Sequence, residues 1–101
     1  MKKGYNSFSE FYTFYLTEHS NSLNRRLHFT GTSLVILTLI FAVITGNWLI
    51  LIFIPVFGYG FAWVGHFIVE KNRPATFDNP FYSLAADFVM FREILTGKIK
   101  F

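Results

Sequence analysis

The longest apolar stretch of the chain runs from Leu27 to Val69 and contains no Asp, Glu, Lys or Arg. A turn signal, Gly46-Asn47, divides it into two halves of about 20 residues each. At roughly 1.5 Å per residue, each half as a helix would span the hydrocarbon core of a bilayer, which is about 30 Å thick. The pattern therefore predicts a transmembrane hairpin of two spans, over residues 22–46 and 48–72.

Two shorter segments with helical spacing flank this hairpin. Ser7 and Glu10 form a capping box for a helix over residues 7–20, which is too short and too charged to cross a membrane. Pro80 suits the first position of another short helix over residues 80–96. We expect both helices to lie in the membrane interface, the first with its aromatic side toward lipid or the hairpin.

The composition agrees with a single all-α integral membrane domain over residues 1–101. The chain is 52% hydrophobic and 21% aromatic, and its 101 residues leave no room for a large soluble core. It has no cysteine, which excludes disulfides, thiolate metal sites and cysteine nucleophiles. Glu10 and Glu18 interrupt the first helix, so the N-terminal segment does not read as a secretory signal peptide.

The positive charges favour one orientation in the membrane. All nine Lys and Arg residues precede or follow the apolar stretch, and the connecting turn has none. The positive-inside rule then assigns both termini to the cytoplasm, at the plasma membrane of a prokaryote or the endoplasmic reticulum of a eukaryote. Contact with anionic membrane lipid accounts for the net charge of +3, so no nucleic acid partner is expected.

The candidate chemistry lies at one end of the predicted hairpin. His28 and His66 stand near the two ends of the apolar stretch, so the turn brings them to one depth. The N-terminal helix leads to His19, and Glu70 follows His66 by one helical turn. Polar residues that share a level in a membrane are a functional-site hypothesis. Imidazole with carboxylate is a ligand set for iron(II) or zinc.

Two other classes of function are compatible with the same residues. His28 and His66 on facing helices could hold a haem iron axially, which would leave His19 without a role. A non-enzymatic membrane adaptor or lipid-binding protein would use its basic residues for headgroups and its histidines as ordinary interfacial side chains. The sequence has no serine-nucleophile motif, phosphate-binding glycine loop or dinucleotide fingerprint.

Three motifs resemble a membrane family formerly catalogued as a domain of unknown function. The fungal member that has been characterised is an iron(II)-dependent dioxygenase of the endoplasmic reticulum, which shortens 2-hydroxy fatty acids by one carbon in phytosphingosine breakdown. The resemblance covers residues 7–91. Its motifs are Glu18-His19-Ser20-Asn21, Arg26-Leu27-His28-Phe29-x-Gly31-Thr32 and Gly65-His66-x-x-x-Glu70-x-Asn72-Arg73-Pro74-Ala75-Thr76.

The resemblance implies that His19, His28 and His66 hold iron(II), for which zinc can substitute. Glu70 would be a fourth ligand or an acceptor that orients an imidazole. The implied reaction is alpha-oxidation, in which a 2-hydroxy fatty acid and dioxygen give the acid one carbon shorter, carbon dioxide and water. The substrate supplies all four electrons, so no 2-oxoglutarate, flavin or nicotinamide is required.

Further roles are expected around this metal site. Asp87 is a candidate for proton transfer, and Glu70 is a second catalytic candidate. One hairpin with two short helices offers little wall for an acyl pocket, so a homo-oligomer is also expected. The residues expected to bind the substrate are basic or polar and lie near the histidines, namely Arg25, Arg26, Asn72 and Arg73.

Overall fold

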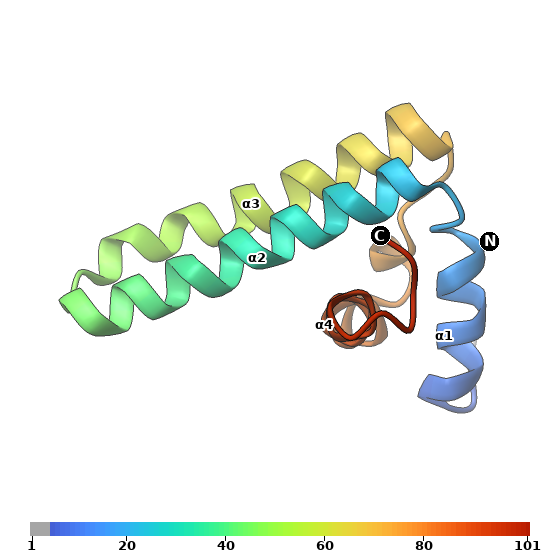
Figure 1. Cartoon of the computed structure of the whole chain (residues 1–101), viewed down its shortest axis with the longest axis horizontal. Coiled ribbons are helices and arrows are strands. Elements are labelled where there is room, and N and C mark those ends of the chain that lie inside the picture. The colour runs from blue at the N-terminus through green and yellow to red at the C-terminus, as the bar shows by residue number, and fades with distance from the viewer. Residues whose placement is uncertain (1–4) are drawn as a thin grey trace.

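Figure 1 shows the computed structural model of the chain, which describes residues 5–101. Every regular element in this range is a helix, as the sequence predicts. The long helix α2 (Ser22–Thr45) runs antiparallel beside a second helical segment, Trp48–Glu70. α1 (Phe8–Thr17) and α4 (Pro80–Leu95) gather at the end of this pair where the chain enters α2.

The ends of α2 follow from local hydrogen bonds. Asn21 is its N-cap, because its side-chain Oδ1 accepts a hydrogen bond from the backbone N–H of Leu23 at 2.8 Å. Gly46 ends the helix with a φ of 70°, a left-handed conformation that glycine adopts without strain. The chain therefore reverses direction at the predicted position.

The second long segment has three parts: a 3₁₀ turn η1 (Trp48–Ile52), helix α3 (Phe53–Trp63) and a π-helix η2 (Val64–Glu70). The sequence predicts a kink in the middle of this segment at Pro55. Instead, Pro55 lies in the first turn of α3, directly after the 3₁₀ turn, where a missing N–H is tolerated best. π-helical turns are rare and often mark functional sites.

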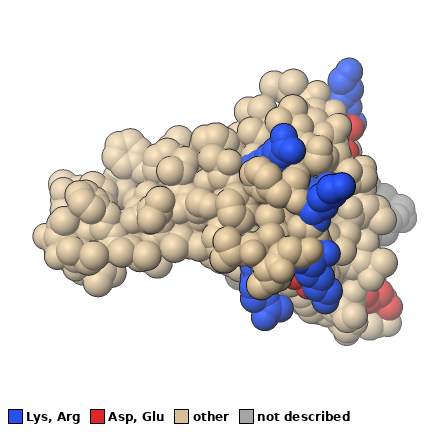
Figure 2. All heavy atoms as spheres, viewed as in Figure 1, with Lys and Arg blue, Asp and Glu red and all other residues tan. Residues whose placement is uncertain are grey.

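Both long segments have the length and composition of a membrane span. Only 22% of the most apolar window in α2 and 11% of that in Trp48–Glu70 are buried inside the protein. The core helix of a soluble domain would be mostly buried, so these apolar surfaces face outward. Figure 2 shows Lys and Arg gathered at the broad end of the molecule, while the narrow end is uncharged on this face. Lys2 and Lys3 lie outside the described residues.

Small residues bring α2 and the second segment close together at Gly31 and Gly65. A Cβ atom at Gly31 would lie 2.7 Å from the carbonyl oxygen of Phe57, and one at Gly65 would overlap the side chain of Asn24. Gly60, in contrast, faces open space. The helices thus approach most closely on the half of the hairpin that leads to the histidines.

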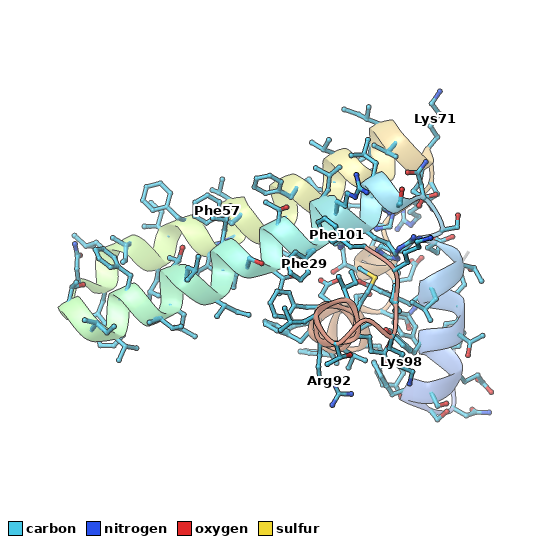
Figure 3. All side chains as sticks on the ribbon, in the orientation of Figure 1. Phe29, Phe57, Lys71, Arg92, Lys98 and Phe101 are labelled. Atoms are coloured by element: carbon cyan, nitrogen blue, oxygen red, sulfur yellow. The ribbon has the colours of Figure 1, made fainter. Side chains whose placement is uncertain are left out.

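The sequence predicts that the aromatic side of α1 faces lipid or the hairpin. In the structure, Phe11 and Tyr15 on this side instead pack mainly on α4. The hydroxyl of Tyr12 donates a 2.6 Å hydrogen bond to Glu93 on α4. α4 in turn covers the histidine end of the hairpin. Phe91 of α4 stacks on Phe29 of α2, and Figure 3 shows Phe29 on the side of α2 that faces α4. The buried core between these helices consists of Phe11, Tyr15, Ala75, Ala86, Met90 and Ile94.

Candidate metal centre

The three histidines of the chain meet in one buried cluster. His19 follows α1, His28 lies in the second turn of α2 and His66 lies in the π-helix η2. Their exposed fractions are 1%, 6% and 2%. One ring nitrogen from each lies within 4.8 Å of the other two. Residues 19, 28 and 66 are thus brought together as the sequence predicts, from three separate elements.

His19 is held by the end of α1. Its Nδ1 lies 2.7 Å from the carbonyl oxygen of Tyr15, and its ring stacks on the Tyr15 ring with 4.0 Å between centroids. Because a carbonyl oxygen only accepts hydrogen bonds, Nδ1 carries the proton and Nε2 presents a lone pair. Burial, followed by the neighbouring His28 and His66, lowers the pKa of His19 well below its usual value. The ring is therefore neutral, as a metal ligand must be.

His66 is oriented by Asn72, which stands six residues later in the chain, just beyond the end of η2. Its Nδ1 lies 2.7 Å from Oδ1 of Asn72. The Nδ2 of Asn72 donates to the carbonyl oxygen of Glu18 at 3.2 Å, which fixes the amide so that its oxygen faces the ring. His66 therefore also carries its proton on Nδ1. Asn72 reaches this position because Lys71 takes a left-handed φ of 58° after the π-helix.

His28 is oriented by a carboxylate from α4. Its Nδ1 lies 3.5 Å from Oδ1 of Asp87, and the same carboxylate accepts a hydrogen bond from the hydroxyl of Tyr15. Burial and the Asp87 charge raise the pKa of Tyr15 well above its usual value, so this phenol stays a donor. A carboxylate behind a ligating histidine fixes its tautomer and raises its basicity. The third Nε2 thus also faces inward with a free lone pair.

The converging nitrogens fit a divalent metal ion. Nε2 of His19 and Nε2 of His28 lie 3.1 Å apart, and the tautomers above place no proton between them. Two lone pairs at this distance repel each other unless a cation lies between them. At metal–nitrogen distances of about 2.0–2.1 Å, neighbouring ligand nitrogens come roughly 3 Å apart. Three neutral imidazoles suit zinc or iron and leave coordination positions open for other ligands.

A cavity of about 410 Å³ opens beside the histidines, between α2, α3 and α4. All three histidines and Asp87 form its polar end. Its remaining wall is largely apolar and includes Val35, Pro55, Trp63, Leu84 and Phe88. The site therefore combines a potential metal centre with a space suited to an apolar chain.

The structure does not bring Glu70 together with the three ligand nitrogens. Instead, its carboxylate accepts a 2.7 Å hydrogen bond from the backbone N–H of Asn21 and a 3.3 Å bond from the amide of Asn24. Glu70 does not line the cavity either, so neither a ligand position nor a proton-transfer position is visible for it. Asp87, the other catalytic candidate, lies at the site.

None of the four predicted substrate-binding residues lines the cavity. Arg25 donates to the carbonyl oxygens of His19 and Ser20 at 3.0 and 2.8 Å. Arg26 donates to the carbonyl oxygen of Phe101 at 3.3 Å, and Arg73 pairs with Asp78 at 3.4 Å. Asn72 orients His66. These side chains hold the frame of the site together rather than reaching into the cavity.

Two polar residues of the site were not predicted from the sequence. Tyr15 stands four residues before His19, and this spacing on one helix face was an available signal. Ser83 stands four residues before Asp87 on α4. It is only 4% exposed, lies in the cavity wall, and its hydroxyl has no hydrogen-bond partner among the described residues. An isolated serine carries no sequence signal of this kind.

The comparison with protein families agrees with this geometry. The family model described as Mpo1-like, 2-hydroxy-palmitic acid dioxygenase Mpo1-like, matches residues 5–99, which is nearly the whole chain. No curated protein and no solved structure matches the sequence or the structure of this chain. The matched range includes all three histidines and every residue that orients them.

Proposed function

The chain belongs to the Mpo1-like family, and we propose that it is an iron(II)-dependent membrane dioxygenase that acts on 2-hydroxy fatty acids. The observation that carries this proposal is the convergence of three neutral imidazoles at the polar end of an apolar cavity. Its product would be the acid one carbon shorter, with carbon dioxide and water. Atoms and electrons balance, because the substrate loses four electrons and dioxygen takes up four.

His19, His28 and His66 would hold the iron, and bound iron(II) would supply the activation of dioxygen. The residues around it have separate tasks. Tyr15, Asp87 and Asn72 hold the three rings so that their Nε2 atoms face inward. No Lys or Arg among the described residues lines the cavity, so a bound metal ion would supply the positive charge that attracts a substrate carboxylate.

The cavity accounts for the rest of the substrate. An acyl chain would lie along its apolar wall between α3 and α4, while the carboxylate and 2-hydroxyl point toward the histidines. Asp87 is the carboxylate of the cavity wall, with its side chain 30% exposed, and it would accept the proton that the 2-hydroxyl releases. α4 completes the wall within one chain, so the acyl site does not require a homo-oligomer.

The arrangement in the membrane follows from the surface. α2 and Trp48–Glu70 would both cross the bilayer, with the basic broad end and both termini on the cytoplasmic side against anionic lipid. The turn at Gly46-Asn47 would face the opposite side. Because the chain has no cysteine, a single cysteine at position 47 reports this directly. It should react with an impermeant maleimide only from outside, and labelling only from the cytoplasm would contradict the topology.

A single ion is favoured over haem because three nitrogens converge rather than two. The haem alternative has His28 and His66 as axial ligands, and Nε2 of His19, which lies 3.1 Å from Nε2 of His28, occupies space that the macrocycle would need. Purified protein with a haem absorption band would contradict this choice. The adaptor alternative would give a protein that binds neither iron nor zinc near a one-to-one ratio.

The reaction is tested with protein purified without oxygen and loaded with iron(II). With dioxygen and no 2-oxoglutarate, it should convert 2-hydroxy-palmitic acid to the acid one carbon shorter and release carbon dioxide. Palmitic acid is the matched control, and it should not react because it lacks the 2-hydroxyl, and because its conversion to the same product would release six electrons, two more than one dioxygen takes up. Equal turnover of both acids, or turnover of neither by iron-loaded protein, would overturn the proposal.

A further inference from the structure

Glu70 belongs to the motif around His66, but the proposed reaction leaves it without a task. It is the last residue of the π-helix η2 and is half-buried. Its two carboxylate oxygens accept from the backbone N–H of Asn21 at 2.7 Å, from the Asn24 amide at 3.3 Å and from the Ser20 hydroxyl at 3.5 Å. Ser20 and Asn21 belong to the segment that joins α1 to α2, and Asn24 lies in the first turn of α2.

This joining segment, residues 18–21, carries His19 but has little regular structure of its own. α1 ends at Thr17 and α2 begins at Ser22. The backbone N–H of Asn21 lies at the start of α2, where no helical carbonyl is available to accept it. The Glu70 carboxylate supplies that acceptor and places a negative charge at the positive end of the α2 dipole. The segment is therefore fixed from outside.

Asn72 fixes the same segment on the other side of His19. Its amide donates to the carbonyl oxygen of Glu18, while its oxygen orients His66. Asn24 adds a cross-link, since its amide donates both to Glu18 at 3.4 Å and to Glu70. Asn24 is fully buried, and only a glycine at position 65 leaves room for it. The end of the second long segment thus holds the backbone before and after His19.

We propose that Glu70 is a positioning residue that sets the His19 ligand in place. It acts on the backbone after His19 rather than on the metal. Removal of the carboxylate would free the Asn21 N–H and loosen the segment, while His28 and His66 stay fixed within their helices. The expected consequence is a metal site that keeps two firm ligands and loses the third. The inference rests on the metal site but not on the dioxygenase reaction.

The test is a double-mutant cycle on metal binding, with cobalt(II) alone as the probe. Glu70→Ala should lower cobalt affinity about 10- to 100-fold, the usual effect of losing a group that orients a ligand. In a His19→Ala background the same change should have almost no further effect, because its target is gone. In a His66→Ala background it should lower affinity as much as in the wild type.

Two variants separate positioning from charge and from folding. Glu70→Gln should retain most of the affinity, since its amide oxygen can still accept from the backbone N–H of Asn21 and its NH₂ group can donate to the hydroxyl oxygen of Ser20, which lies 3.5 Å from the Glu70 carboxylate. Glu10→Ala, a carboxylate removed at the other end of α1, should retain full affinity. A full additive loss on the His19→Ala background would contradict the proposal, as would unchanged affinity in Glu70→Ala.

A second measurement needs no metal and no activity. In metal-free protein, the Asn21 N–H should exchange with solvent faster in Glu70→Ala than in the wild type, whereas N–H groups within α2 should keep their protection. The NMR signal of the His19 Nδ1 proton should broaden or shift in the same variant. If both signals stay unchanged, Glu70 does not position His19, whatever reaction the protein catalyses.

Discussion

The two ends of the α2 and α3 pair are built in opposite ways. At the broad end, Asn24 and His28 are buried in α2 and His66 in η2, each tied to a neighbouring element. Toward the turn, large apolar side chains point outward, with Ile44 76% and Leu49 81% exposed. The same two helices therefore carry a polar, internally satisfied site at one end and an apolar outer surface at the other.

This difference indicates what each end requires from its surroundings. The site end contains its own hydrogen-bond partners, so its geometry depends on specific residues of α1, α4 and η2. The turn end has few partners within the chain, and its exposed apolar surface is stable only in an apolar environment. Substitutions should accordingly change metal binding at the first end and membrane insertion at the second.

The largest expected effect contrasts a histidine with an apolar residue on the same helix. His28→Ala and His66→Ala should each lower metal affinity by more than about 100-fold, because loss of a ligand costs more than loss of a group that orients one. Leu39→Ala, an exposed position nearer the turn, should leave affinity unchanged. Metal titration in detergent measures all three. Equal losses at positions 28 and 39 would show that the two ends are not independent.

The next contrast uses two glycines of the second long segment. Gly65→Ala should destabilise the protein by about 1–3 kcal/mol or more, because the added Cβ would overlap the buried Asn24. Gly60→Ala meets open space and should stabilise the helix by up to about 1 kcal/mol. Chemical denaturation in detergent measures both. If Gly65→Ala is tolerated as well as Gly60→Ala, the close packing at the site end is not required.

A smaller effect is expected at Asp87, which orients His28 and accepts from Tyr15. Asp87→Asn should lower metal affinity about 10- to 100-fold while the helix content stays unchanged. Tyr15→Phe keeps the ring that stacks on His19 and removes only the hydroxyl, so its effect should be smaller. If Tyr15→Phe lowered metal affinity more than Asp87→Asn, the tyrosine hydroxyl would contribute more to the site than the carboxylate.

Most of the fold could be predicted because strong local signals mark it. Gly46 ends α2 and Pro80 begins α4, as a left-handed glycine and a first-turn proline indicate. The hairpin geometry predicts that His28 and His66 share one depth, and the helix before the hairpin leads His19 to the same level. These inferences depend on chain direction and helix length, which the sequence contains.

The tasks of the polar residues could not be predicted in the same way. Glu70 stands one turn after His66, yet the π-helix and the left-handed Lys71 turn its carboxylate toward Asn21 and away from the ligands. A regular α-helix would have been the default expectation. The arginines near the histidines were also expected to meet substrate, whereas Arg25 instead holds backbone carbonyls. Basic residues beside a site do not reveal which way they point.

The smallest expected effect lies at the contact between α1 and α4, where Tyr12 donates to Glu93. Tyr12→Phe should cost about 1 kcal/mol at neutral pH, the usual contribution of one hydrogen bond. The exposed Tyr59 on α3 is the matched position nearer the turn, and Tyr59→Phe should leave stability unchanged at that pH. Thermal unfolding of the two variants against the wild type measures this contrast.

Unfolding at alkaline pH tests the same hydrogen bond between Tyr12 and Glu93. Burial, followed by the hydrogen bond to Glu93, raises the pKa of Tyr12 above its usual value of 10.0. The unfolded chain therefore loses this proton first as pH rises past 10, and the stability that depends on the bound proton is lost from there upward. Tyr12→Phe cannot lose that proton, so its stability should fall less steeply above pH 10 than that of the wild type. If the stability of Tyr12→Phe and of the wild type fell equally steeply above pH 10, the packing of α1 would not depend on this hydrogen bond. The aromatic packing of Phe11 against α4 would then be the contact that holds α1 in place.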